Sequence, residues 1–251
     1  MKKGQVTAYI ILGIVIVAAF AFVFFARSEF VKSVISRVTE REVIVPLEFR
    51  PTNELIKDCL NGISNDAIYL VGIQGGYVRT VNHPTVDYFG LKAAYLNDNG
   101  KNLMPSKSVV EKELTDYINL NAKNCITNFS NVEVTNVGKT NTIVTILDNS
   151  VKTEINWPLD LKSKELTFQF KKFDINVPIR LGALREIILM LIEELIENRE
   201  NICMSCIANI GLDNNLYIEV FPFNNDLVFT VNDLSSVINE RPYKFIFASR
   251  F

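Results

Sequence analysis

The chain has 251 residues and a formal net charge of −2, with 26 Lys and Arg against 28 Asp and Glu. This balance, without a basic cluster, argues against nucleic acid as a partner. The single histidine, His83, precedes Pro84 in a polar stretch, which indicates a surface loop and excludes metal sites that need two imidazoles.

An uncharged apolar run near the N-terminus is the first predicted element. It covers the 19 residues from 8 to 26. As a helix this run would be long enough to cross a bilayer core of roughly 30 Å. A cleaved secretory signal has a shorter apolar core followed by small residues, whereas four phenylalanines crowd the end of this run. We therefore expect a retained transmembrane helix.

Apolar residues continue beyond this run at three- and four-residue spacing. The pattern predicts one helix over about 7–41, first in lipid and then amphipathic. Pro46 and Pro51 exclude its continuation. Charge alone leaves the orientation open, because the two lysines before the run favour a cytoplasmic N-terminus while four basic residues follow it.

The first residues also resemble a known processing signal. Lys2-Lys3-Gly4-Gln5-Val6-Thr7, followed by the apolar helix, resembles the class III signal of archaeal type IV pilins and pilin-like proteins. The resemblance implies that a prepilin-type peptidase cuts between Gly4 and Gln5, and that the head lies outside the cytoplasm. It also implies a long N-terminal helix that is half embedded in the membrane or filament core and half packed on a β-rich head. The chain departs from the pattern at Tyr9, where many pilins carry a glutamate that registers neighbouring subunits.

The rest of the chain alternates irregularly between helices and strands. Three helices are expected, at 53–72 with Asn53 as cap, at 108–125 with a Ser108–Glu111 capping box, and at 181–198. Strands are expected at 86–96, 132–137, 140–147, 151–157, 165–173, 216–221, 227–231 and 243–248. Trp157-Pro158 and Val177-Pro178 are expected to mark strand ends. Together these elements predict an α+β fold with antiparallel sheets.

Residues 1–45 are expected to supply the leader with the transmembrane and juxtamembrane helix, and residues 46–251 the extracytoplasmic head. The head can be one domain or two α+β subunits, 46–175 and 176–251, since no flexible linker marks a boundary. The Gly75-Gly76 pair indicates a turn, because its surroundings lack the Lys and the Ser or Thr of a phosphate-binding loop.

Four cysteines, an even number, are typical of an oxidising location. Three pairings are possible; we prefer Cys59–Cys125 with Cys203–Cys206, since two packed helices could bring the first pair together. The Cys-Met-Ser-Cys motif has three interpretations, which we favour in this order: a structural disulfide or buried thiols, a redox pair, and part of a zinc site. The redox interpretation ranks lower because the motif follows a helix, whereas such a pair should begin one after a strand.

No GxSxG, HExxH or phosphate-binding motif occurs, so we expect no enzyme activity, cofactor or metal. Asn128-Phe129-Ser130 matches the acceptor pattern for N-glycosylation.

We predict a membrane-anchored, pilin-like archaeal cell-surface protein with a structural, adhesion or filament-assembly role. Its expected partners are the lipid bilayer, a prepilin-type peptidase, and copies of itself or pilin-like subunits. The alternatives are a non-polymerising single-pass accessory protein whose head binds a partner, and a tethered CxxC redox enzyme.

Overall fold

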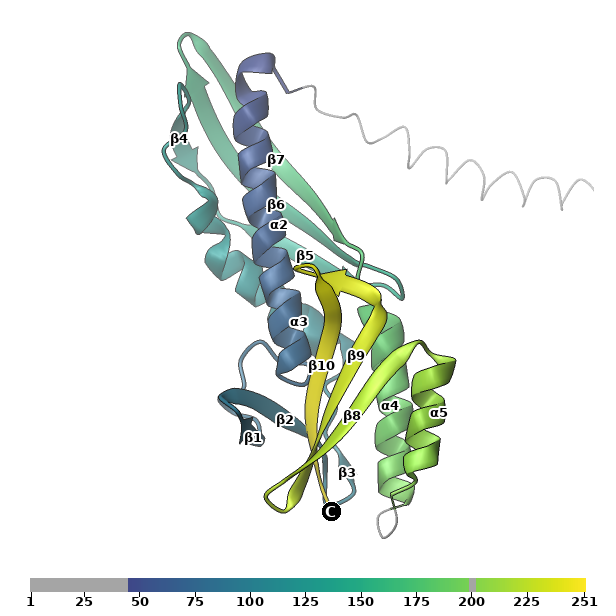
Figure 1. Cartoon of the computed structure of the whole chain (residues 1–251). Helices are drawn as coiled ribbons and strands as arrows, with labels where there is room; N and C mark the ends of the chain where they lie inside the picture. The colour runs from purple at the N-terminus through teal and green to yellow at the C-terminus, as the bar shows by residue number, and fades with distance from the viewer. Residues whose placement is uncertain (1–44, 199–201) are drawn as a thin grey trace, which may run out of the picture. The chain divides into compact units, whose positions relative to one another are not determined.

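The computed structural model describes residues 45–198 and 202–251 (Figure 1). The leader, the processing residues Gly4 and Gln5, Tyr9 and the helix expected over about 7–41 lie outside the described residues. Within the described ranges, no helix combines the length and the apolar character that crossing a membrane requires.

The larger sheet contains β1 (Thr85–Tyr88), β2 (Leu91–Asp98), β3 (Lys101–Asn102), β8 (Leu216–Phe223), β9 (Asp226–Ile238) and β10 (Arg241–Arg250). Its strand order is β1-β2-β10-β9-β8, with β3 paired to the end of β2. Neighbouring strands are antiparallel except for β2 and β10, which run parallel. This parallel pair places strands from 46–175 and from 176–251 in one sheet.

The smaller sheet contains β4 (Glu133–Val137), β5 (Asn141–Ile146), β6 (Val151–Ser163) and β7 (Leu166–Val177). The long strand β6 is its centre: β7 pairs with one edge, while β5 and β4 share the other, each at one end. Side chains along β6 alternate between buried and exposed, which is the period of a strand with one face against a core.

The helices are η1 (Leu47–Phe49), α2 (Arg50–Ile73), α3 (Lys107–Asn121), η2 (Ala122–Cys125), α4 (Leu181–Glu197) and α5 (Met204–Asp213). Figure 1 shows α2 running lengthwise through the head, in contact with α3 and with a strand of each sheet, β7 and β10. The pair α4 and α5 packs beside the larger sheet, where α4 contacts β2 and β3 and α5 contacts β8. The α2 helix therefore joins both sheets into one core.

The core is built from apolar side chains that the two periodicities place on inner faces. Ile56 and Leu60 of α2, one helical turn apart, are both completely buried. Trp157 of β6 is also completely buried, and its indole nitrogen donates to the carbonyl of Gly138 at 3.1 Å. The burial of such aromatic side chains is the largest apolar contribution that single residues make to folding.

The α+β class and the antiparallel character of most strands are confirmed, but the described part of the head has four α-helices where three were expected. The additional helix is α5, which begins directly after the Cys203 cap. The prediction that Asn53 caps the first helix is wrong: α2 begins at Arg50 with Pro51 in its first turn, where the missing N–H of proline costs nothing. The prediction of a Ser108–Glu111 capping box is also wrong.

The cap of α3 is Ser106, whose side chain accepts a hydrogen bond from the N–H of Val109. Glu111 instead accepts from the N–H of Ile146 at 2.9 Å, so that its carboxylate ties α3 to β5. The expected strand 86–96 is a hairpin of β1 and β2, turned at Phe89 and Gly90, both of which have positive φ.

A strand end was expected at Trp157-Pro158, and this prediction is wrong as well. The strand β6 continues through Pro158 because the register shifts between Asn156 and Leu159, which leaves the proline outside the ladder. The end expected at Val177-Pro178 is confirmed, since β7 stops at Val177.

Candidate functional site

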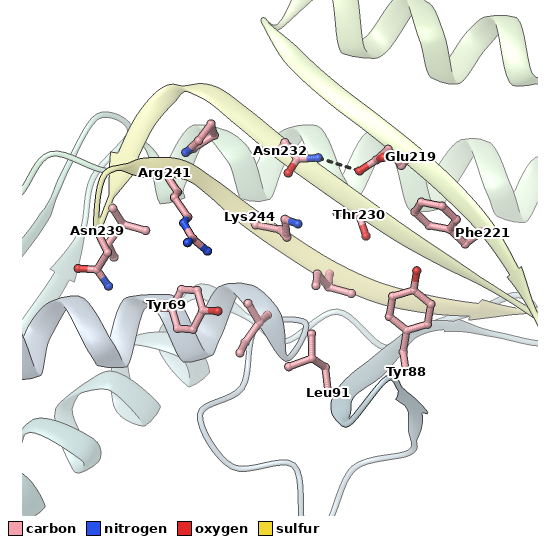
Figure 2. A pocket seen from close by; sticks show the side chains of 14 residues that line it. Tyr69, Tyr88, Leu91, Glu219, Phe221, Thr230, Asn232, Asn239, Arg241 and Lys244 are labelled. Atoms are coloured by element: carbon pink, nitrogen blue, oxygen red, sulfur yellow. Dashed lines mark hydrogen bonds between the residues drawn. The ribbon is translucent and has the colours of Figure 1, made fainter.

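A groove with a volume of about 720 Å³ lies among α2, the β1–β2 hairpin and strands β8, β9 and β10 (Figure 2). A volume of several hundred cubic ångströms is typical of sites that hold small molecules or short polymer segments. Its lining combines aromatic rings, amides and charged groups: Tyr69, Tyr88, Phe221, Asn232, Asn239, Glu219, Arg241 and Lys244.

Local periodicity explains why these side chains share the groove. Lys244 and Ile246 line it from β10, two residues apart, while Tyr243, Phe245 and Phe247 between and beyond them are completely or almost completely buried. The same spacing brings Glu219 and Phe221 to the groove from β8, and Thr230 and Asn232 from β9. On α2, Tyr69 and Ile73 are four residues apart and lie on one helical face.

The floor of the groove belongs to the core. Ile73 and Ile246 are buried in an apolar cluster with Tyr95 and Val228, and Tyr88 and Leu91 pack against that cluster. The Tyr88 ring also contacts Phe221, with centroids 6.1 Å apart. An occupant would therefore meet a fixed apolar surface rather than mobile side chains.

The rim of the groove carries more positive than negative charge. Arg241 and Lys244 both extend from β10, and among the described residues neither forms an ion pair. Glu219 is the carboxylate in the lining, and it accepts a hydrogen bond from the Asn232 amide at 3.3 Å. Two cationic side chains and one carboxylate, which is already hydrogen-bonded, suit an anionic ligand. The apolar floor suits a ligand that also has a flat apolar side.

A polar cluster near the C-terminus links three strands of the same sheet. Tyr95 donates to Asp226 at 2.5 Å, and Arg250 donates to the other oxygen of that carboxylate at 3.3 Å. The Arg250 guanidinium also lies 4.3 Å from the centre of the Tyr95 ring. Burial and the Asp226 hydrogen bond raise the pKa of Tyr95. These contacts join β2, β9 and β10, so we assign them a structural role.

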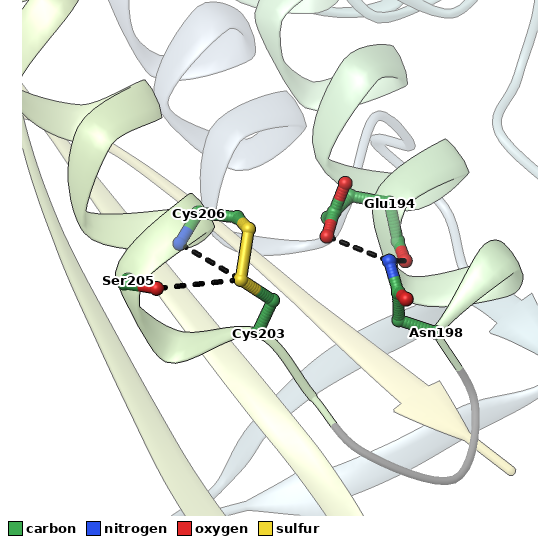
Figure 3. The surroundings of a disulfide bond; sticks show 5 residues. All are labelled: Glu194, Asn198, Cys203, Ser205 and Cys206. Atoms are coloured by element: carbon green, nitrogen blue, oxygen red, sulfur yellow. Dashed lines mark hydrogen bonds between the residues drawn. A yellow bond between two sulfur atoms is a disulfide. The ribbon is translucent and has the colours of Figure 1, made fainter.

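The four cysteines form two disulfides, in the pairing that the sequence analysis preferred. Cys59–Cys125 joins α2 to the end of η2, with a sequence separation of 66 and 5.5 Å between the Cα atoms of the partners. Cys203–Cys206 lies at the start of α5 (Figure 3). The motif therefore begins a helix, which was not expected, but it follows α4 and not a strand, as expected.

Contacts around the second disulfide come from both of the neighbouring helices. The Cys203 sulfur accepts from the N–H of Cys206 at 3.2 Å and lies 3.4 Å from the Ser205 hydroxyl. A carboxylate oxygen of Glu194, on α4, and the two sulfurs all lie within 4.8 Å of one another. These three groups could hold a cation only if the disulfide were reduced, because a metal binds thiolates.

The remaining residues singled out from the sequence lie apart from both places. Asn128 is exposed in the segment between η2 and β4, and Ser130 of the same acceptor pattern is exposed too. His83 stacks on Tyr77 with ring centroids 3.8 Å apart, in the loop before β1. The groove was not predicted from the sequence, since Arg241 and Lys244 are three residues apart in β10 and do not follow a simple strand alternation. The chain matches no protein-family model, curated protein or solved structure.

Proposed function

We propose that the chain is a membrane-anchored, pilin-like cell-surface protein whose α+β head faces the oxidising side of the membrane. The observation that carries this proposal is the pairing of all four cysteines of the sequence in two disulfides. Such bonds persist in extracytoplasmic compartments and are rare where thiols are kept reduced. The basic start, the Gly4-Gln5 pair and the apolar run that follows supply the anchor and the export route.

The mature N-terminus tests this proposal. Intact mass and terminal peptide mapping of protein from native membranes should give a chain that begins at Gln5. A Gly4→Leu variant should keep its leader, because a small residue before the cut is what the resemblance requires. Lys3→Arg, which keeps the charge, is the matched control and should be processed normally. A wild-type chain that still begins at Met1 would overturn the export route.

A second candidate is an accessory protein that does not polymerise and whose head binds a partner. The groove favours it, since Arg241 and Lys244, which form no ion pair with any residue of 45–198 or 202–251, lie beside exposed rings and suit a carboxylate-bearing polymer of the cell envelope. Retention of the full-length chain on immobilised polygalacturonate, compared with neutral dextran, tests this candidate. Retention should weaken as salt rises, because exposed charges are screened.

The groove itself is tested by reversing its charge. A double Arg241→Glu, Lys244→Glu variant should lose most of the retention. The matched control is Lys152→Glu with Lys162→Glu, which changes net charge equally on exposed positions of β6. Equal losses in the two variants would mean that overall charge, and not the groove, governs retention.

A further inference from the structure

We propose that Cys203–Cys206 is an exchange-active disulfide that accepts two electrons from a dithiol of a partner protein. This activity goes beyond anchoring and surface display. It rests on three features of the described residues: the place of the bond in its helix, a neighbouring carboxylate, and a contrast with the other disulfide.

The first feature is the start of α5, a helix of 10 residues. Cys203 is its N-cap, and the Cys203 sulfur accepts the N–H of Cys206 at 3.2 Å, with the Ser205 hydroxyl 3.4 Å away. A thiolate formed on Cys203 would keep both partners and would face the positive end of the helix dipole. Cys203 is thus the better leaving group and nucleophile of the pair.

The second feature is Glu194, which extends from α4 toward the bond (Figure 3). Its carboxylate lies within 4.8 Å of both sulfurs, and the Asn198 amide donates to it at 2.7 Å. A carboxylate at this distance can deliver or take up the proton that each exchange step moves, directly or through one water. The hydrogen bond from Asn198 holds that carboxylate beside the disulfide.

The third feature is the contrast between the two disulfides. Cys59–Cys125 ties two separate elements at a sequence separation of 66; Cys59 is partly exposed, but its partner Cys125 is only 2% exposed. Cys203 and Cys206 are three residues apart within one helix start, and both are partly exposed. A bond that closes so short a loop restricts the unfolded chain much less. It is also open to an attacking thiolate, as exchange requires.

Exchange proceeds in two thiol–disulfide steps. A partner thiolate attacks the Cys203 sulfur, the bond between Cys203 and Cys206 breaks, and Cys206 leaves and takes a proton through Glu194. The second partner thiol loses its proton and attacks the partner sulfur of the mixed disulfide. Cys203 then leaves as a thiolate. The partner ends as a disulfide, oxidised by two electrons, and the chain holds the reduced pair; the reverse sequence reduces a partner disulfide.

Differential reduction of the oxidised full-length chain tests the proposal. The chain is equilibrated with graded dithiothreitol, quenched in acid and alkylated, and each cysteine is quantified by peptide mass. Cys203–Cys206 should open at a dithiothreitol concentration at least tenfold below that for Cys59–Cys125. Reduction of both bonds at the same concentration would overturn the proposal.

Variants separate exchange from simple lability. Cys206→Ser leaves Cys203 as a free thiol, which should attack a model peptide disulfide and trap that peptide as a mixed disulfide on Cys203. Glu194→Gln, which keeps the Cys203–Cys206 bond, should slow exchange with the reduced, dithiol form of the peptide several-fold. The control Glu197→Gln, exposed on the same helix, should exchange at the wild-type rate. An absent mixed disulfide, or a Glu194→Gln rate equal to that of the control, would show a merely accessible structural bond.

Discussion

Partly buried Arg180 and buried Arg185 show how the hydrogen-bond partners of a guanidinium group determine the free-energy cost of burying its charge. Arg180 donates from its Nε to both oxygens of Asp233 at 2.8 Å, and from a terminal nitrogen to the carbonyl of Asn214 at 2.6 Å. Arg185 has one such bond, to the carbonyl of Pro105 at 2.7 Å. Its other two guanidinium nitrogens have no partner among the described residues. Burial lowers the pKa of Arg185.

Replacing Arg185 should therefore stabilise the protein. Arg185→Met keeps an unbranched side chain but removes the poorly satisfied charge, and we expect a gain of about 1–3 kcal/mol in the free energy of unfolding. Arg180→Met, the matched change, should cost about 3 kcal/mol or more, because it leaves the completely buried Asp233 unpaired. Urea unfolding of the full-length chain measures both. A loss in both variants would contradict the assignment of Arg185 as an unsatisfied charge.

Tyr243 provides a pH-dependent test at the same scale. Its hydroxyl donates to the carbonyl of Ile68 at 3.0 Å, and complete burial raises its pKa. A raised pKa contributes stability that is fully present below the unfolded-state pKa of about 10, and that declines as the pH rises beyond it. At neutral pH, Tyr243→Phe should cost about 1 kcal/mol for the lost hydrogen bond.

Above pH 10 the gap in free energy of unfolding between wild type and Tyr243→Phe should shrink, and it should close by about pH 11. One pH unit beyond the unfolded-state pKa removes about 1.4 kcal/mol from the wild type alone, since phenylalanine does not titrate. Chemical unfolding at pH 8, 10 and 11 measures the gap. The control is Tyr217→Phe, which changes a side chain that is 58% exposed. Its free energy of unfolding should fall with pH in the same way as that of the wild type. A gap for Tyr243→Phe that is constant with pH would contradict this reading.

At the scale of elements, α2 contains two glycines with opposite surroundings. A Cβ on Gly62 would meet nothing within 4 Å, whereas one on Gly72 would lie 2.3 Å from the carbonyl oxygen of Lys244 in β10. Gly62→Ala should stabilise the chain by about 0.5–1 kcal/mol, because alanine is the better helix former. Gly72→Ala should destabilise it, since helix and strand must separate. Thermal unfolding of both variants checks this, and a gain in both would contradict the close approach of α2 to β10.

The elements also show which local patterns determine structure. Three helices with extended apolar stripes were predictable, and so was the end of β7 at Val177. The short helix α5 was missed because its cap is a cysteine, which is not among the usual capping residues. The strand β6 runs through Pro158 because a bulge removes that residue from the ladder, and such a bulge is set by tertiary pairing.

At the scale of the whole molecule, the groove could not be predicted because its lining spans residues 69–246 and depends on long-range pairing. The β2 and β10 strands are neighbours only through their parallel register, which no local sequence pattern specifies. The disulfides were predictable because four cysteines allow only three pairings, and because two helices packed side by side can bring Cys59 and Cys125 together. The proposed processing between Gly4 and Gln5, in contrast, follows from a local motif, residues 2–7 and the apolar run after them.

Glycosylation provides a test of the proposed side of the membrane that does not depend on the leader. Asn128 and Ser130 are exposed, between the Cys125 disulfide and β4. If the head is extracytoplasmic in a host that modifies Asn-X-Ser, peptide mass mapping of the native protein should find a glycan on Asn128. Asn128→Gln and Ser130→Ala should both abolish the added mass, while Ser130→Thr should retain it, because the acceptor pattern needs a hydroxyl two residues on. A uniformly unmodified Asn128 in a host that glycosylates its other surface proteins would contradict the extracytoplasmic head.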